Sequence, residues 1–262
     1  MVNQLQLPVQ KATAMLSTQE LSICYGNTTA LRNVNLEISQ NEIFGIIGPA
    51  NAGKTSFLKA LNRMDDFNAD MHVQGTVRFN GHDINTWRNI YALRSRIGVV
   101  FPLPVGLPLS VYDNVALAPR LAGIKSKADL DVIVERCLTR AALWDEVKDR
   151  QDALGSLLSG GQQQRLTIAR ALSQDPELLM LDEFSIAVDP VTTMRIEDVL
   201  KELKKEITII LVTNLVQQAR RLADRTALFL EGECVEIGVT EDLFTGTVKD
   251  QRTRDYVEGK FG

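Results

Sequence analysis

The stretch GPANAGKT, Gly48–Thr55, indicates how most of the chain folds. It matches the pattern G-x-x-x-x-G-K-[ST], with the short apolar run EIFGII before it and the helix-like run KTSFLKALNRM after it. In this strand–loop–helix setting, loop amides and the positive end of the helix bind the oxygens of a di- or triphosphate. The alternative is a plain glycine turn before a helix, and the flanking segments strongly favour the nucleotide-binding loop.

The residues of this loop have separate expected roles. Lys54 is predicted to reach the β- and γ-phosphates of ATP, and the Thr55 hydroxyl to bind Mg²⁺, which keeps most of its other ligands as water and phosphate. The residues predicted to contact the nucleotide in this segment are Gly48, Pro49, Ala50, Asn51, Ala52, Gly53, Lys54, Thr55 and Ser56.

A second candidate element is LLMLDE, Leu178–Glu183. An apolar strand that ends in two carboxylates is costly unless a cation meets them. Asp182 is therefore predicted to hold Mg²⁺ through water, and Glu183, which points to the other side, to be the general base for the attacking water. An acidic turn at a strand end is the alternative, and it is a poor explanation in a chain that also carries a phosphate-binding loop.

A second glycine pair opens a second helix in LLSGGQQQRLTIARAL, Leu157–Leu172. Ser159 is placed to cap this helix from about Gly160, and the glycines Gly160 and Gly161 allow backbone to approach a ligand. The residues alone leave two interpretations equally open. One is a helix N-terminus prepared for an anion, and the other is a capped helix with a flexible lead-in.

Composition excludes several classes of protein. A net charge of −4 over 262 residues offers no broad basic surface for nucleic acid. Three separated cysteines predict free thiols and not a disulfide framework. Neither His72 nor His82 has a Cys or His neighbour at metal-ligand spacing. No apolar run approaches the roughly 18 residues of a membrane span, and the first residues lack the pattern of a secretory signal.

Strand-like and helix-like runs alternate along the chain, which predicts a mainly parallel α/β core. The region from about residue 110 to 156 reads as all-helical and is predicted to be an insertion into that core. Asn80-Gly81 is a hairpin-turn signal, and Asp189-Pro190 predicts the start of a helix that runs to Lys205. Residues 1–17 are expected to form a poorly ordered polar tail.

Tyr25 follows the first strand, at a place where its ring could stack on adenine. A tyrosine at a strand end more often serves packing. Tyr25 is therefore a weak candidate for the nucleotide site.

The three motifs, in this order, resemble those of the ATP-binding cassette (ABC) ATPases. The resemblance implies one domain over residues 18–262, with a P-loop NTPase core at about 18–105 and 157–262. It also implies an N-terminal antiparallel β subdomain and a helical subdomain at about 106–156 together with the start of the signature helix. In that family the LSGGQ signature, here Ser159, Gly160, Gly161 and Gln162, caps the γ-phosphate of ATP held by the opposite subunit. The second glycine pair would then act in a head-to-tail dimer.

A narrower resemblance is to the ATP-binding subunit of bacterial phosphate importers. It rests on ALNRMDD, SVYDNVA, AALWDEVKDR and the ending YVEGKFG, of which Trp144–Arg150 is the most specific piece. It implies ATP hydrolysis at the cytoplasmic side of the membrane. The implied partners are a second ATPase subunit, identical or not, two integral membrane permease subunits and, indirectly, an extracytoplasmic phosphate-binding protein.

Four positions in three places depart from the family pattern. Pro102 stands where the family has a glutamine that touches Mg²⁺ and the attacking water, and proline offers neither a side-chain ligand nor an N–H. Asn214 stands where the family has a histidine on the γ-phosphate; it keeps a donor but takes up no proton near neutral pH. Phe184 and Ile186 replace a proline and a serine.

Two hypotheses from different classes follow. The first is an enzyme that energises phosphate import, which the retained Glu183 favours. The second is an ATP-binding regulatory module or the catalytically weak half of a heterodimer, which Pro102 and Asn214 favour.

Overall fold

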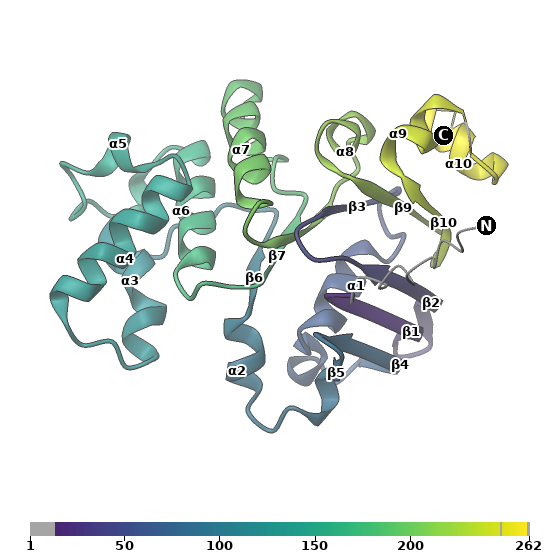
Figure 1. The fold of residues 1–262 in the computed structure, drawn as a ribbon, viewed down its shortest axis with the longest axis horizontal. Helices are drawn as coiled ribbons and strands as arrows, with labels where there is room; N and C mark the ends of the chain where they lie inside the picture. The colour runs from purple at the N-terminus through teal and green to yellow at the C-terminus, as the bar shows by residue number, and fades with distance from the viewer. Residues whose placement is uncertain (1–13, 247, 261–262) are drawn as a thin grey trace, which may run out of the picture.

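The computed structural model describes residues 14–246 and 248–260. It confirms the predicted α/β fold with a mainly parallel sheet, an N-terminal antiparallel sheet and an inserted helical region. Figure 1 shows the helical region at one end of the molecule and the antiparallel sheet at the other, with the parallel sheet between them.

The antiparallel sheet has the strand order β2-β1-β4-β5. Its strands are β1 (Leu16–Tyr25), β2 (Thr28–Ile38), β4 (Met71–Phe79) and β5 (His82–Asp83). The predicted turn joins β4 to β5, and Asn80 and Gly81 both have positive φ, 50° and 77°. Two-residue hairpin turns need this conformation, which explains why Asn-Gly stands there.

The central sheet has the order β10-β9-β3-β8-β7-β6 and is parallel except at its β10 edge. The strands are β3 (Ile43–Ile47), β6 (Ile97–Val100), β7 (Leu178–Asp182), β8 (Thr208–Val212), β9 (Arg225–Leu230) and β10 (Glu233–Val239). Every residue of β3, β7 and β8 is buried, as expected for parallel strands that are covered on both faces.

Side chains of the central strands alternate between two hydrophobic cores. In β7, Leu179 and Leu181 face a core that they share with the helical region. Leu178 and Met180 face a core that they share with α1 (Lys54–Leu61) and the antiparallel sheet. Successive side chains of a strand point to opposite faces of the sheet, so each face of the sheet packs against a different layer.

The helical region contains α3 (Val111–Leu121), α4 (Lys127–Arg140) and α5 (Trp144–Val147), and α6 (Gly160–Leu172) follows it. Helices α3 and α4 pack against each other and against α6, which also packs on β6. The signature helix α6 therefore contacts both the helical region and the core.

The remaining helices surround the core. They are α2 (Ile90–Ser95), α7 (Pro190–Leu203), α8 (Val216–Leu222), α9 (Thr240–Thr245) and α10 (Gln251–Val257), with 3₁₀ turns at η1 (Met64–Phe67), η2 (Ile84–Thr86) and η3 (Gly155–Leu157). As predicted, Asp189 caps α7 by accepting the Thr192 N–H at 3.0 Å. The helix ends at Leu203, two residues before the expected Lys205.

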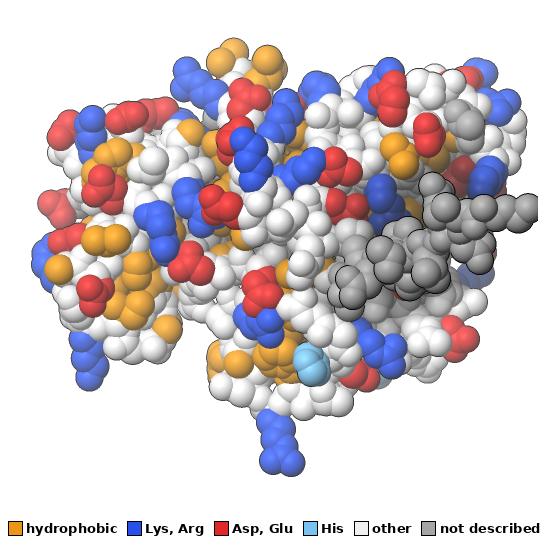
Figure 2. All heavy atoms as spheres, in the orientation of Figure 1, with side chains coloured by type: hydrophobic (Ala, Val, Ile, Leu, Met, Phe, Trp, Pro, Cys, Tyr) orange, Lys and Arg blue, Asp and Glu red, His pale blue; other side chains and the backbone are white. Residues whose placement is uncertain are grey.

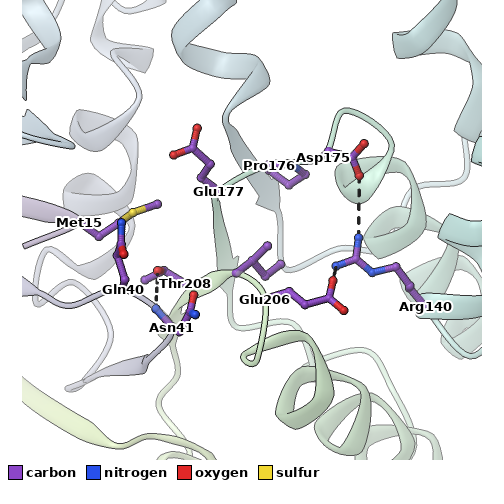
Figure 3. A pocket seen from close by; sticks show the side chains of 10 residues that line it. Met15, Gln40, Asn41, Arg140, Asp175, Pro176, Glu177, Glu206 and Thr208 are labelled. Atoms are coloured by element: carbon purple, nitrogen blue, oxygen red, sulfur yellow. Dashed lines mark hydrogen bonds and ion pairs between the residues drawn. The ribbon is translucent and has the colours of Figure 1, made fainter.

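Ion pairs join the helical region to the edge of the sheet where β7 and β8 begin (Figure 3). Arg140 of α4 donates to Glu206 at 2.7 Å and lies 3.9 Å from Asp175, which also accepts from Arg136 at 2.8 Å. These side chains flank a hollow of about 440 Å³. Its charged groups are largely paired with one another, so the hollow marks a joint between the two parts.

The first strand starts earlier than expected. Most of the predicted tail, residues 1–13, lies outside the described residues, but β1 begins at Leu16, so the expectation of a tail up to residue 17 was wrong at its end. Leu16 is fully buried and pairs with Ile38 and Phe79, which draws it into the sheet.

None of the helices in the described part is long and apolar enough to cross a membrane. Figure 2 shows basic and acidic side chains interspersed over one face.

Candidate nucleotide-binding site

Three of the predicted site segments lie at the carboxyl edge of the central sheet. Parallel strands β3, β8 and β7 are neighbours, with Val212 in register with both Ile46 and Asp182. The phosphate loop follows β3, the Glu183 loop follows β7 and the Asn214 loop follows β8. The Glu183 N–H donates to the Val212 carbonyl at 2.9 Å, so the last two loops are joined already at the backbone.

Two glycines of the phosphate loop are required by their surroundings. Gly48 has φ 151°, and a Cβ there would lie 2.0 Å from the Phe229 carbonyl oxygen. Gly53 has φ 93°, and a Cβ there would lie 2.5 Å from the Ala30 carbonyl oxygen. Only glycine fits both the conformation and the space. The loop leads into α1, which begins at Lys54 as predicted.

Lys54 lies inside this loop. Its ammonium donates to the carbonyls of Gly48 and Pro49 at 2.7 and 2.8 Å and lies 3.6 Å from Glu183 Oε1. The side chain is only 4% exposed, and burial lowers its pKa, while Glu183 and Asp182 act in the opposite direction. An ammonium held inside the phosphate loop is suited to charge-assisted hydrogen bonds with a polyanionic ligand.

Thr55 and Asp182 form the part of the site that suits a cation. The Thr55 hydroxyl donates to Asp182 Oδ2 at 2.8 Å. Asp182 Oδ1 is buried and makes no hydrogen bond, and burial raises the pKa of this carboxyl. A buried oxygen without a partner is costly, and a hydroxyl beside a carboxylate is a donor set that Mg²⁺ accepts. The residues present therefore fit the predicted metal.

Glu183 occupies a tight turn directly after β7. Its φ of 44° is uncommon for a residue with a side chain, and the turn is closed by the Ile186 N–H, which donates to the Glu183 carbonyl at 3.1 Å. Phe184 is fully buried in the core beneath. The aromatic ring at this unusual position thus anchors the turn, while Ile186 remains 61% exposed.

The signature segment forms the capped helix start that the sequence predicts. The Gln162 N–H donates to Ser159 Oγ at 3.4 Å, and the Ser159 N–H donates to Gln162 Oε1 at 3.2 Å, a reciprocal capping box. A Cβ at Gly161 would lie 2.5 Å from Thr192 Cγ2, so this glycine allows α6 to approach the first turn of α7. Gly160 is exposed.

The signature and the phosphate loop are not joined within the chain. Among residues 14–246 and 248–260, no hydrogen bond or ion pair links Ser159–Gln162 to Gly48–Ser56. Both interpretations of the glycine pair are therefore still open: the capping is present, and the anion-binding role stays a prediction.

Glu146 supports the signature helix and was not singled out from the sequence. It accepts from Arg165 at 2.7 and 3.0 Å and from Gln162 at 2.9 Å, and Arg165 is only 4% exposed. Arg165 first, and Gln162 after it, lowers the pKa of this carboxyl. The one signal was that Glu146 lies in the segment Trp144–Arg150, which carries the most specific resemblance.

Pro102 and Asn214, two of the departing residues, lie in the loops that follow β6 and β8. Pro102 lies in the loop after β6 and is half-buried, and the loop is attached to α6 by the Gly106 N–H, which donates to Gln163 Oε1 at 3.0 Å. Asn214 follows β8 and is exposed. In the described part of the chain, its side chain makes no hydrogen bond, so it is free to meet a ligand.

Two tyrosines lie at the end of β1 and in α10. Tyr25 is half-buried and donates its hydroxyl to Met71 Sδ at 3.4 Å, which agrees with packing and leaves adenine stacking a prediction. Tyr256 of α10 is 9% exposed; burial raises the pKa of its hydroxyl, and the Gly48 backbone acts in the opposite direction. The sequence motif YVEGKFG had pointed to this region but not to any role.

Other titratable clusters do not form sites. The described residues contain no group of three or more His, Cys, Asp or Glu side chains that could hold a metal ion. Cys24, Cys137 and Cys234 are free thiols, as predicted. Burial raises the pKa of the Cys234 thiol to about 12, which makes it unreactive.

Comparisons with known proteins show the family of this chain. The family model described as ABC transporter matches residues 31–185. The protein named Phosphate import ATP-binding protein PstB 3, found both in Streptococcus pneumoniae serotype 4 (strain TIGR4) and in Streptococcus pneumoniae strain R6, is 47% identical over 247 residues, 94% of this chain and 98% of the relative.

Solved structures show the same fold. CbiO1 from Clostridium perfringens, part of the ABC transporter complex CbiONQ, superposes with a TM-score of 0.78 at 27% identity, covering 90% of this chain and 92% of that one. A dimeric ATP-binding cassette in a post-hydrolysis state, with ADP and Pi bound, superposes with a TM-score of 0.75 at 28% identity. The match covers 86% of this chain and 99% of that one. With its phosphate loop, its Asp182–Glu183 strand end and its signature helix arranged as described, the chain belongs to the family of ABC transporter ATPases.

Proposed function

We propose that this chain is the ATP-hydrolysing subunit of an importer for inorganic phosphate. The observation that carries the proposal is the 47% identity to a phosphate import ATP-binding protein over nearly the whole length of both chains. The arrangement of Lys54, Asp182 and Glu183 at one sheet edge supports hydrolysis.

The reaction follows from the positions of these side chains. Lys54 and the loop amides bind the phosphates, and when Mg²⁺ is bound beside Thr55 and Asp182 it neutralises charge on them. Glu183 takes a proton from the attacking water onto a carboxylate oxygen. Asn214, exposed beyond β8, donates its amide to the γ-phosphate.

Two copies form the working unit in this proposal. The signature residues Ser159–Gln162 make no bond to the phosphate loop of their own chain, and the relative with ADP and Pi is a dimer. We infer that Ser159, Gly160, Gly161 and Gln162 of one copy face the ATP held by the other. Exposed apolar side chains near the start of α7, Ile186, Val191 and Met194, support an interface there.

Membrane subunits are the other proposed partners, at the cytoplasmic side of the membrane. A groove of about 700 Å³ runs between α2, α3 and α6, and Tyr91 and Leu121 line it at 79% and 80% exposure. Arg94 and Arg170 add positive charge to its wall. Such an apolar and basic groove suits a short amphipathic segment of a permease.

A weak or regulatory paralogue is the second candidate, and Pro102 and Asn214 are the observations that favour it. One experiment tests both: the chain is co-purified with its native membrane subunits, reconstituted in vesicles, and assayed for ATP hydrolysis and phosphate uptake. The main proposal expects both activities. ATP binding without either activity supports the second candidate.

A further inference from the structure

A buried glutamine outside the predicted site is hydrogen-bonded to two loops of that site. Gln218 lies in α8 and is 1% exposed. Thr213 Oγ1 donates to its Oε1 at 2.9 Å, and its Nε2 donates to Ser185 Oγ at 3.1 Å and to Glu197 Oε1 at 3.3 Å. The three partners come from the Asn214 loop, the Glu183 loop and α7.

The direction of each hydrogen bond is determined by its neighbours. Thr213 Oγ1 already accepts the Leu215 N–H at 3.0 Å, so its own hydrogen points to Gln218 Oε1. Glu197 accepts from Arg221 at 2.6 and 2.9 Å; an ionised carboxylate only accepts, so it receives the Gln218 amino group. The amide is thus held in one orientation, and its acceptor Glu197 is itself fixed and 3% exposed.

We propose that Gln218 is a positioning residue that holds the Glu183 loop and the Asn214 loop in a fixed relation. Ser185 is two residues after Glu183, and Thr213 is one residue before Asn214. Within the described ranges, no other side chain bonds to both loops. The inference rests on the roles proposed above for Glu183 and Asn214.

The physical consequence is that two groups which act on the same phosphate keep fixed positions relative to each other. A general base and a donor contribute fully only when both are held close to the productive geometry, and a displacement of about 1 Å costs about 100-fold in rate. Phe184 anchors the Glu183 turn and one backbone hydrogen bond joins the two loops, but Asn214 is exposed and its side chain makes no hydrogen bond among the described residues. The buried Gln218 amide adds a side-chain link between the two loops.

The test compares Gln218→Leu and Gln218→Glu with the matched control Gln217→Leu, because Gln217 is the exposed neighbour on the same helix. For Gln218→Leu we expect kcat for ATP to fall about 10- to 100-fold while KM stays within about two-fold. The control is expected to keep the parent values. Unchanged kcat, or an equal loss in nucleotide affinity, overturns the inference.

The glutamate variant gives a second readout. Its carboxyl accepts from Thr213 when ionised, but it then faces the Glu197 carboxylate and donates nothing; when protonated it donates one hydrogen bond, where Gln218 donates two. The charged groups around it are Glu197 and Arg221, with Asp198 and Lys201 lining the adjoining groove. We therefore expect the kcat of Gln218→Glu, relative to the parent, to recover as pH falls. A pH-independent ratio counts against a positioning role.

Hydrogen exchange separates this inference from the proposed function. In Gln218→Leu, amides of 183–189 and of 212–216 are both expected to exchange at least about ten-fold faster, whether or not the parent hydrolyses ATP. Faster exchange in one loop only, or in neither, contradicts the connection. If the parent shows no hydrolysis, the proposed function fails, and this measurement still decides the inference.

Discussion

The Thr55 hydroxyl donates a hydrogen bond of 2.8 Å to Asp182 Oδ2 across 127 residues of chain. The bond joins the first turn of α1 to the end of β7. It uses one carboxylate oxygen and leaves the other, Oδ1, buried and without a partner. The pair is therefore arranged so that a cation can complete it.

Asp182→Asn tests that arrangement. Asparagine keeps an acceptor for Thr55 but removes the charge, so the tightening of ATP binding by Mg²⁺ is expected to fall at least about ten-fold while binding without Mg²⁺ changes little. Nucleotide titrations with and without Mg²⁺ measure both. An unaltered dependence on Mg²⁺ would show that the metal is held elsewhere.

The same variant has a stability consequence. Burial raises the folded-state pKa of Asp182, so its contribution to stability is fully present below the unfolded-state pKa and is lost as pH rises through the folded-state value. The ionised group therefore destabilises the nucleotide-free protein near neutral pH. Asp182→Asn is expected to raise the Tm of that form, and thermal unfolding at pH 5 and pH 8 checks whether the gain is larger at the higher pH.

Lys54→Ala is expected to weaken ATP binding by about 2–3 kcal/mol, because it removes charge-assisted contacts to the phosphates. Lys59 lies on the same helix, so Lys59→Ala is a matched control that should bind almost as the parent does. Isothermal titration measures both affinities. Equal affinities in the two variants would disprove the assignment of the phosphate loop.

Glu146→Ala is expected to lower the free energy of unfolding by about 3 kcal/mol, since it leaves the buried Arg165 without its carboxylate. The control is Asp145→Ala, which removes only an exposed pair with Lys148 and should cost less than about 1 kcal/mol. Urea unfolding measures the difference. Because the folded-state pKa of Glu146 is lowered, its contribution is present above the unfolded-state pKa and is lost as acid protonates the folded form.

Local signals in the sequence were sufficient where a residue and its partner are close along the chain. The capping pair Ser159 and Gln162, the Asp189 cap and the Asn80-Gly81 turn all depend on neighbours within three residues. Long-range polar contacts left no such signal. Gln218 reads as an ordinary helix residue until folding brings it to Ser185, 33 residues away.

The same distinction applies to the site. The phosphate loop and the acidic strand end could be recognised in the sequence because each carries its chemistry within one motif. The parallel sheet then brings the two motifs to one edge. The start of β1 was placed too late because Leu16 owes its order to Ile38 and Phe79 on other strands. Tyr256 reaches Gly48 only through the packing of the last helix.

Glu183→Gln is expected to trap an ATP-bound dimer, because glutamine preserves the shape of the side chain but does not take the proton of water. Light scattering at saturating Mg-ATP should show the dimer, and Gly160→Asp in the same background should abolish it by placing a carboxylate at the exposed signature. Matched ATP affinity in both proteins is the control. A persistent monomer in the single variant would argue against the site shared between copies.

Turnover is expected to be slow, and Pro102 and Asn214 are the local cause. Loss of one preorganised polar contact at a developing charge costs about 100- to 1000-fold in rate at the extreme, and Asn214 keeps a donor, so its share is smaller. Asn214→His is therefore expected to raise the ATPase rate. Adding Pro102→Gln should raise it further and non-additively, because both groups meet the same phosphate.

Affinity for nucleotide supplies the control for these two substitutions. The phosphate loop provides most of the binding, so ATP affinity should stay within about two-fold while kcat rises. Asn214 is exposed and without a hydrogen bond among the described residues, so its replacement by histidine breaks no existing contact. If the parent already turns over as fast as the double variant, the proline and the asparagine are compensated elsewhere, and the Ser185–Gln218–Thr213 connection between the two loops is the first place to look for that compensation.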